Sequence, residues 1–141
     1  MPSATPVEVL ARRNQLILNR DADGFADLFA LDGVIEAPFV GRSAMPPRLE
    51  GRAAIREFSR QVMASPLRID NFEVVELHQT QDPEVVIAET RAEATITSTG
   101  QSFTAISIQV FRIRDGQIVL FRDYANPQAM EDVLGEPRPA G

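Results

Sequence analysis

The second half of this chain consists of four stretches rich in Val, Ile, Thr and Phe, separated from one another by turn-forming residues. The stretches cover residues 71–80, 84–97, 102–114 and 117–125. Apolar and polar residues alternate along them, which is the pattern of half-buried strands. The last two are joined by Asp115-Gly116, a dipeptide typical of tight hairpins. A chain that ends in this way is strongly constrained to form an antiparallel meander.

The first half shows the helical period instead. Apolar side chains recur three and four positions apart over residues 6–19 and 52–64, and Asp21 suits the N-cap of a short helix between them. A short strand is predicted over 33–40, followed by a Pro/Gly-rich loop over 41–51. Helices before an antiparallel sheet predict the α+β class. We expect a cone-shaped barrel, in which a curved, mainly antiparallel sheet packs against three N-terminal helices around an apolar interior.

Length and charge exclude several classes of protein. The 141 residues suffice for one domain, predicted over 1–135 with a flexible tail at 136–141. No apolar run approaches the ~20 residues that cross a bilayer, and the first residues lack the features of a secretion signal. We therefore expect a cytoplasmic protein with no membrane partner. A net charge of −6 without a basic stripe argues against nucleic acid as a partner.

The chemistry open to the chain is narrow, because it has no cysteine and one histidine, His78. Thiolate nucleophiles, disulfides and metal sites with two histidines are excluded. No glycine spacing predicts a nucleotide site and no acidic spacing demands a metal, so we expect neither cofactor nor metal. A lone imidazole is more often structural than catalytic, which leaves carboxylates, arginines, hydroxyls and amides as the candidate groups.

Two strands carry charged residues from which a site could be built. Glu89, Arg91 and Glu93 share one face of their strand, which is either a solvated row of weak ion pairs or part of a site. Asp123 shares a face of the last strand with Phe121. It is either an edge carboxylate paired with an arginine or a pocket acid whose desolvation raises its pKa.

Three segments resemble a known group of proteins: Asp23–Phe39, Leu49–Phe58 and, most specifically, Arg114–Pro127. On these residues the chain is similar to the SnoaL-like group of the nuclear-transport-factor-like superfamily. That group includes polyketide cyclases, ketosteroid isomerases and limonene-epoxide hydrolases. The resemblance spans nearly the whole chain and implies the same cone-shaped α+β fold, whereas function transfers poorly because this fold carries many chemistries.

The resemblance also implies roles for individual residues. The Arg-Asp-Tyr motif of the last strand places the acid/base aspartate of the cyclases at Asp123. Arg91 and Glu93 fall where limonene-epoxide hydrolases have the Arg-x-Asp pair that works with this aspartate, allowing one gap and Glu for Asp. The implied catalytic set is therefore Asp123 as proton donor or acceptor, with Arg91 holding it and Glu93 in place.

Departures from the family patterns narrow the reaction. Ala37, Asn14 and Gln109 occupy the positions of the base, the oxyanion-hole tyrosine and the protonated acid of ketosteroid isomerases, so that activity is excluded. Epoxide hydrolases position water with a Tyr and an Asn, which fall here at about Ile35 and Ala37. Asn14 is either a pocket hydrogen-bond donor or a polar residue at the edge of a helical stripe. The side chains expected to contact substrate or water are Asn14, Gln109, Glu36 and Phe121.

The sequence thus predicts a cofactor-free acid/base enzyme that acts on a small hydrophobic molecule inside the cone. The reaction is expected to be a cyclisation, an isomerisation or the hydrolysis of an epoxide. Two alternatives stay open: a non-catalytic binder of a hydrophobic ligand and an interaction module. The strand face with Ile106, Ile108 and Val110, next to Ile118 and Leu120, suits burial by helices or by a second copy, and we expect a homodimer.

Overall fold

The computed structural model describes residues 3–39, 46–126 and 128, and its elements follow the predicted order. In chain order they are α1 (Pro6–Leu18), α2 (Ala22–Asp27), β1 (Phe29–Glu36), β2 (Arg48–Glu50), α3 (Arg52–Ala64), β3 (Leu67–Gln79), β4 (Val85–Ile96), β5 (Gln101–Arg114) and β6 (Gln117–Ala125). The tail predicted at 136–141 and part of the loop predicted at 41–51 lie outside the described residues.

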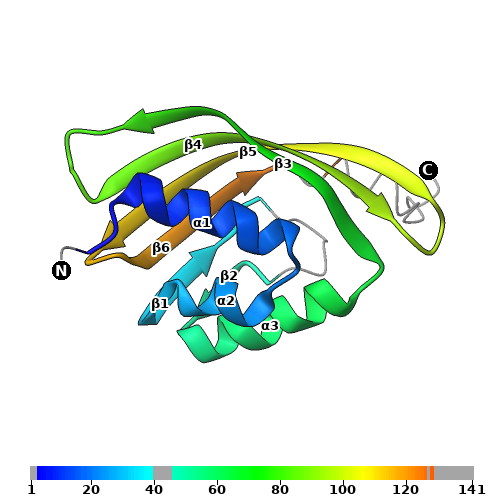
Figure 1. Cartoon of the computed structure of the whole chain (residues 1–141), viewed down its shortest axis with the longest axis horizontal. Coiled ribbons are helices and arrows are strands. Elements are labelled where there is room, and N and C mark those ends of the chain that lie inside the picture. The colour runs from blue at the N-terminus through cyan, green and yellow to red at the C-terminus, as the bar shows by residue number, and fades with distance from the viewer. Residues whose placement is uncertain (1–2, 40–45, 127, 129–141) are drawn as a thin grey trace, which may run out of the picture.

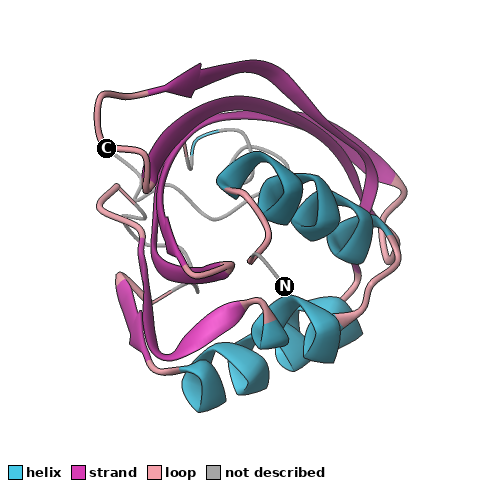
Figure 2. Ribbon diagram, turned by 60° about the vertical axis from the view of Figure 1, so that its left-hand side comes forward, coloured by secondary structure: helices cyan, strands magenta, loops and turns pink. Residues whose placement is uncertain are grey.

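The six strands form one sheet in the order β2-β1-β6-β5-β4-β3. Every neighbouring pair is antiparallel except β1 and β6, which run parallel. The sheet curls around α1, and α2 and α3 lie along its open side (Figures 1 and 2). The predicted α+β cone is confirmed, although the described sheet stays open, with β2 and β3 as its edges.

Two differences from the predicted strands lie around β1. The strand β1 begins at Phe29, earlier than predicted, and an irregularity in its pairing with β6 follows before Val34. A side chain at Gly33 would meet the Ile118 carbonyl oxygen at 2.9 Å, so glycine allows this close approach. The strand β2 falls inside the predicted loop, because three residues are too few to show an alternating pattern.

The start of α1 is fixed by a capping box. The Glu8 backbone N–H donates to Thr5 Oγ1 at 3.2 Å, and the Thr5 backbone N–H donates to Glu8 Oε1 at 3.2 Å. Pro6 occupies the first turn, where its missing N–H costs nothing. The cap thereby fixes the residue at which α1 begins.

The strand register arranges the concave face in rows. One row is wholly apolar and consists of Val86, Phe111, Phe121 and Ile35. The next row runs from Ala88 to Gln109 and ends at Asp123, so polar groups enter the interior there. No helix in the described part of the chain is long and apolar enough to cross a membrane.

Candidate active site

Asp123 lies on the concave face of β6, partly buried and directly opposite Gln109 of β5. The Ser107 hydroxyl donates a short hydrogen bond to Asp123 Oδ1. Burial raises the pKa of Asp123 above its ordinary value, against the lowering effects of the Ser107 hydrogen bond, the Arg13 charge and a Gln109 hydrogen bond. The raised pKa makes proton exchange nearer neutral pH more accessible than for an ordinary aspartate.

Arg13 is the cation of this site, and it comes from α1. Its side chain is fully buried, with a relative exposure of 0%. The guanidinium carbon lies over three aromatic rings, 5.0 Å from the Phe72 centroid, 4.8 Å from that of Phe111 and 5.5 Å from that of Phe121. Burial lowers the pKa of Arg13 to about 9, and the Asp123 charge partly opposes this change.

Gln109 connects the two charged groups. Arg13 Nη1 donates to Gln109 Oε1 at 2.7 Å, while Arg13 Nε donates to Asn14 Oδ1 at 3.0 Å. Because a guanidinium only donates, it fixes the amide oxygen of Gln109 on its own side. The amide nitrogen is then free to donate toward Asp123, in agreement with its lowering effect on the pKa of that carboxyl. We call this hydrogen-bonded group the polar chain; its members are Arg13, Gln109, Asp123 and Ser107.

The predicted contact between Arg91 and Asp123 is wrong. Gln109 faces inward, so Ile106, three positions before it, faces outward, and Arg91 pairs directly with Ile106. Arg91 Nη2 lies 3.7 Å from Glu93 Oε1, and both side chains are half exposed on the convex face. The resemblance placed them only by allowing a gap, and a shift of one residue moves a strand's side chains to the other face. Thr90 takes the buried position instead.

The predicted contact of Glu36 with substrate or water is corrected as well, because Glu36 also lies on the convex face. It pairs with Arg122 across β1 and β6, on the opposite side from Asp123. Arg122 Nε lies 2.9 Å from Glu36 Oε2, and Arg48 Nη1 lies 2.5 Å from Glu36 Oε1. The hydrogen bond from Arg122 is the main cause that lowers the pKa of Glu36. This carboxylate is therefore held in an ion-pair cluster and cannot reach a substrate on the concave face.

His78 lies on the outer side of the sheet as well. Its Nε2 is 2.6 Å from Glu89 Oε2, and each side chain is nearly half exposed. Within the described part of the chain, no group of three or more acidic or histidine side chains is arranged to hold a metal ion.

Three of the predicted contact residues do gather with Asp123. Gln109 and Asn14 both bind Arg13, and Phe121 stacks on Phe111 with centroids 4.6 Å apart. Their contact with a substrate stays a prediction. Sequence reasoning missed Arg13 and Ser107. Arg13 carried a signal, because it falls in the buried stripe of α1, whose members are Val9, Leu10, Arg13 and Leu16.

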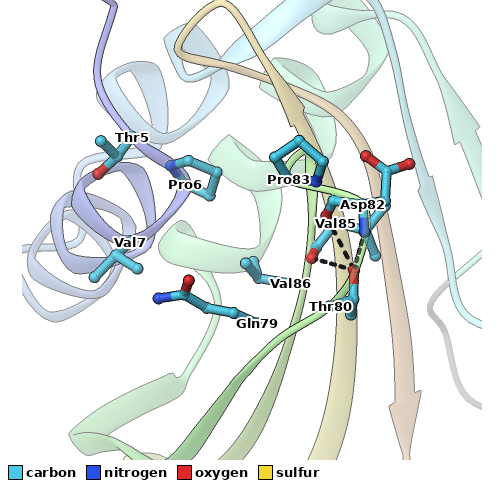
Figure 3. Close-up of a pocket in the computed structure, with 9 residues that line it drawn as sticks. All are labelled: Thr5, Pro6, Val7, Gln79, Thr80, Asp82, Pro83, Val85 and Val86. Atoms are coloured by element: carbon cyan, nitrogen blue, oxygen red, sulfur yellow. Dashed lines mark hydrogen bonds between the residues drawn. The ribbon is translucent and has the colours of Figure 1, made fainter.

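A separate pocket of about 340 Å³ lies between the start of α1 and the turn from β3 to β4 (Figure 3). Its lining consists of Thr5, Pro6, Val7, Gln79, Thr80, Asp82, Pro83, Val85 and Val86. None of the predicted site residues is among them. The Thr80 hydroxyl is occupied within the turn, where it donates to the Val85 carbonyl at 2.9 Å. The Asp82 carboxylate accepts from the Glu84 backbone N–H at 3.0 Å and from Arg112 Nη1 at 3.1 Å, so both polar groups are engaged within and beside the turn.

Comparison with known proteins places the chain in a family and agrees with its fold. The family described as SnoaL-like domain matches residues 10–121. An uncharacterised PhzA/B-like protein of Pseudomonas aeruginosa is 36% identical over 132 residues, which cover 91% of this chain and 89% of that protein. The crystal structure of a putative isomerase from Bacillus subtilis is 28% identical, with 92% and 91% of the two chains covered and a TM-score of 0.85.

More distant structures show the fold alone. A putative polyketide cyclase from Pseudomonas putida is 17% identical over 92% of this chain and 98% of its own, with a TM-score of 0.76. Neighbours at 18% identity include a protein with a ketosteroid isomerase-like fold and an epoxide hydrolase of Mycobacterium tuberculosis. Similar folds therefore occur in proteins that are named for several different reactions.

Proposed function

The chain belongs to the SnoaL-like domain family, and from that premise we propose that it is a cofactor-free acid/base enzyme acting on a small molecule at the concave face of the sheet. The observation that carries the proposal is Asp123, a partly buried carboxyl with a raised pKa inside a chain of hydrogen-bonding partners. Perturbed carboxyls of this kind gather at catalytic sites. Asp123 transfers the proton.

Each neighbour of Asp123 has a part in that transfer. When Asp123 gives up its proton, the Ser107 hydroxyl, the Arg13 charge and the Gln109 amide all stabilise the carboxylate. When it takes the proton back, burial favours the neutral acid. General acid/base assistance of this kind contributes about 10²–10⁴ in rate. Cyclisation, isomerisation and epoxide hydrolysis all fit, because each needs a proton moved to or from carbon or oxygen.

The test follows proton transfer without knowledge of the natural substrate. Enolisable ketones and β-diketones are incubated with the protein in deuterated buffer, and NMR measures the exchange of their α-protons. Epoxides are screened in parallel for hydrolysis. We expect Asp123→Asn to lower any rate found by about 10²–10⁴. Glu93→Gln is the matched control, since it removes a carboxylate from the convex face. Equal rates in the wild type and in Asp123→Asn would contradict the role of Asp123.

We also propose that the protein forms a homodimer through the convex face of the sheet. Val75, Ile106 and Ile108 are 60%, 64% and 49% exposed there, and exposed apolar side chains grouped on one face are typical of an interaction site. Arg91 and Glu93 flank these apolar residues with charges of both signs, which suits a self-complementary contact around a two-fold axis. The polar chain lies on the opposite, concave face of the sheet, so such a dimer does not cover it.

A further inference from the structure

We propose that Arg13 is a specificity-determining residue that binds a negatively charged oxygen of the substrate, either a carboxylate or an enolate. The inference rests on the proposed function and narrows its substrate class. The sequence alone predicted a small hydrophobic molecule. The structure points instead to an apolar molecule that carries one anionic oxygen.

The first observation is a free donor. A guanidinium has five N–H groups, and Arg13 uses only those on Nε and Nη1, toward Asn14 and Gln109. Its Nη2 is buried and has no hydrogen-bond partner among the described residues. Buried donors without a partner are rare in folded proteins, and each calls for a water, an ion or a ligand. A carboxylate or enolate oxygen is the strongest acceptor that such a donor can meet.

The second observation is an uncompensated charge. Within the described part of the chain, no carboxylate lies within ion-pair distance of Arg13, although the side chain is completely buried. The three aromatic rings attract the cation without neutralising it. Asp123 is the carboxyl that acts on it electrostatically, and burial favours the neutral form of that group. While Asp123 holds its proton, an anionic ligand is needed to balance Arg13.

The third observation is the position of this donor relative to the acid. Gln109 contacts Arg13 and, on β5, lies directly opposite Asp123 of the neighbouring strand β6. One side chain therefore separates the cation from the proton carrier. A ligand oxygen on Nη2 brings its carbon skeleton to the same part of the concave face as Asp123. Phe72, Phe111 and Phe121 supply the apolar surroundings for that skeleton.

The test compares ligands of equal shape and different charge. Benzoate and benzamide are titrated into the protein, and binding is measured by calorimetry and by the NMR signals of ¹⁵N-labelled arginine side chains. We expect benzoate to bind about 10- to 100-fold more tightly than benzamide, as expected for a hydrogen bond to a charged group. Dimedone, a cyclic β-diketone whose ultraviolet spectrum reports its enolate, separates the enolate source from the carboxylate source. Binding of either anion through Arg13 supports the proposal.

The variants separate this proposal from the proposed function. Arg13→Met, of similar length, should abolish the preference for benzoate, whereas Asp123→Asn should keep or strengthen it, because a nearby negative charge is gone. Loss of turnover in Asp123→Asn tests the proton carrier independently. Equal binding of benzoate and benzamide to the wild type, or a preference unchanged in Arg13→Met, would overturn the inference. If Arg13→Met does not fold, the wild-type arginine signals decide: a shift of the Arg13 Nη2 signal with benzoate and not with benzamide supports the subsite, and no shift overturns it.

Discussion

The raised pKa of Asp123 predicts how the stability of the protein depends on pH. Its pKa in the folded state lies above the unfolded value of ~3.9. The stability that this group contributes is therefore fully present below the unfolded pKa and is lost as pH rises through the folded pKa. Asp123→Asn removes the titration while it keeps an acceptor for Ser107. Relative to the wild type, the variant should gain stability as pH rises from the unfolded pKa through the folded one.

The size of this gain follows from the pKa. Each unit by which the fold raises the pKa of Asp123 corresponds to ~1.4 kcal/mol that the variant recovers above the folded pKa. Arg13 opposes the rise. In an Arg13→Met background the pKa of Asp123 should therefore rise further, and the gain from Asp123→Asn should be larger. A double-mutant cycle on this pair should give a coupling of about 0.5–3 kcal/mol.

The assay is urea unfolding at pH steps from 4 to 8. Far-UV circular dichroism is the signal, because the chain has no tryptophan and a single tyrosine. Only the change with pH is interpreted, so a constant offset from the new amide does not matter. Glu93→Gln, on the convex face, should differ from the wild type by much less. The reasoning is refuted if the difference in free energy of unfolding between Asp123→Asn and the wild type does not change with pH. It is also refuted if the variant becomes less stable relative to the wild type as pH rises.

Two further predictions concern the convex face. Arg91→Ala should leave the exchange rates unchanged, because Arg91 is half exposed and contacts Glu93 on the convex face rather than Asp123. A large loss of activity would contradict this placement. Ile106→Glu should turn a dimer into a monomer in sedimentation at micromolar concentration, since it puts a charge into an exposed apolar patch. A wild type that is already monomeric would contradict the dimer.

The fold was predictable because its signals are periodic and repeated. The third helix was predicted over 52–64 and observed there, and the last strand likewise over 117–125. The site depends on which face of each helix or strand a given residue occupies, and the sequence specifies this poorly. The spacing of apolar residues places Asn14 at the stripe of the first helix, but the buried stripe passes through its neighbour Arg13. Arginine is among the residues least often fully buried, so apolar patterning passes over it.

The same kind of error, in the face assigned to a residue, explains why the predicted contact of Arg91 with Asp123 is wrong. One residue of shift along a strand decides between the two faces, and a resemblance that allows a gap cannot fix that choice. Asp123 avoids the problem because its motif lies in the last strand, where the match needs no gap. The hairpin at Asp115-Gly116 alone would not place it, since the β5–β6 register shifts by one residue between Arg112 and Ile113 before Asp123 pairs with Gln109.

Burial moves the pKa values of Arg13 and Asp123 toward each other, to about 9 for the arginine and upward for the aspartate. Neither change favours the charged state, so stability alone does not explain why both groups lie inside one small domain. An anionic ligand on Arg13 does explain it. Its negative charge stabilises the guanidinium and, as a like charge, raises the pKa of Asp123 further. Binding of an anionic substrate would therefore favour the protonated form of Asp123, whereas a neutral analogue would not change the pKa of this group in that way.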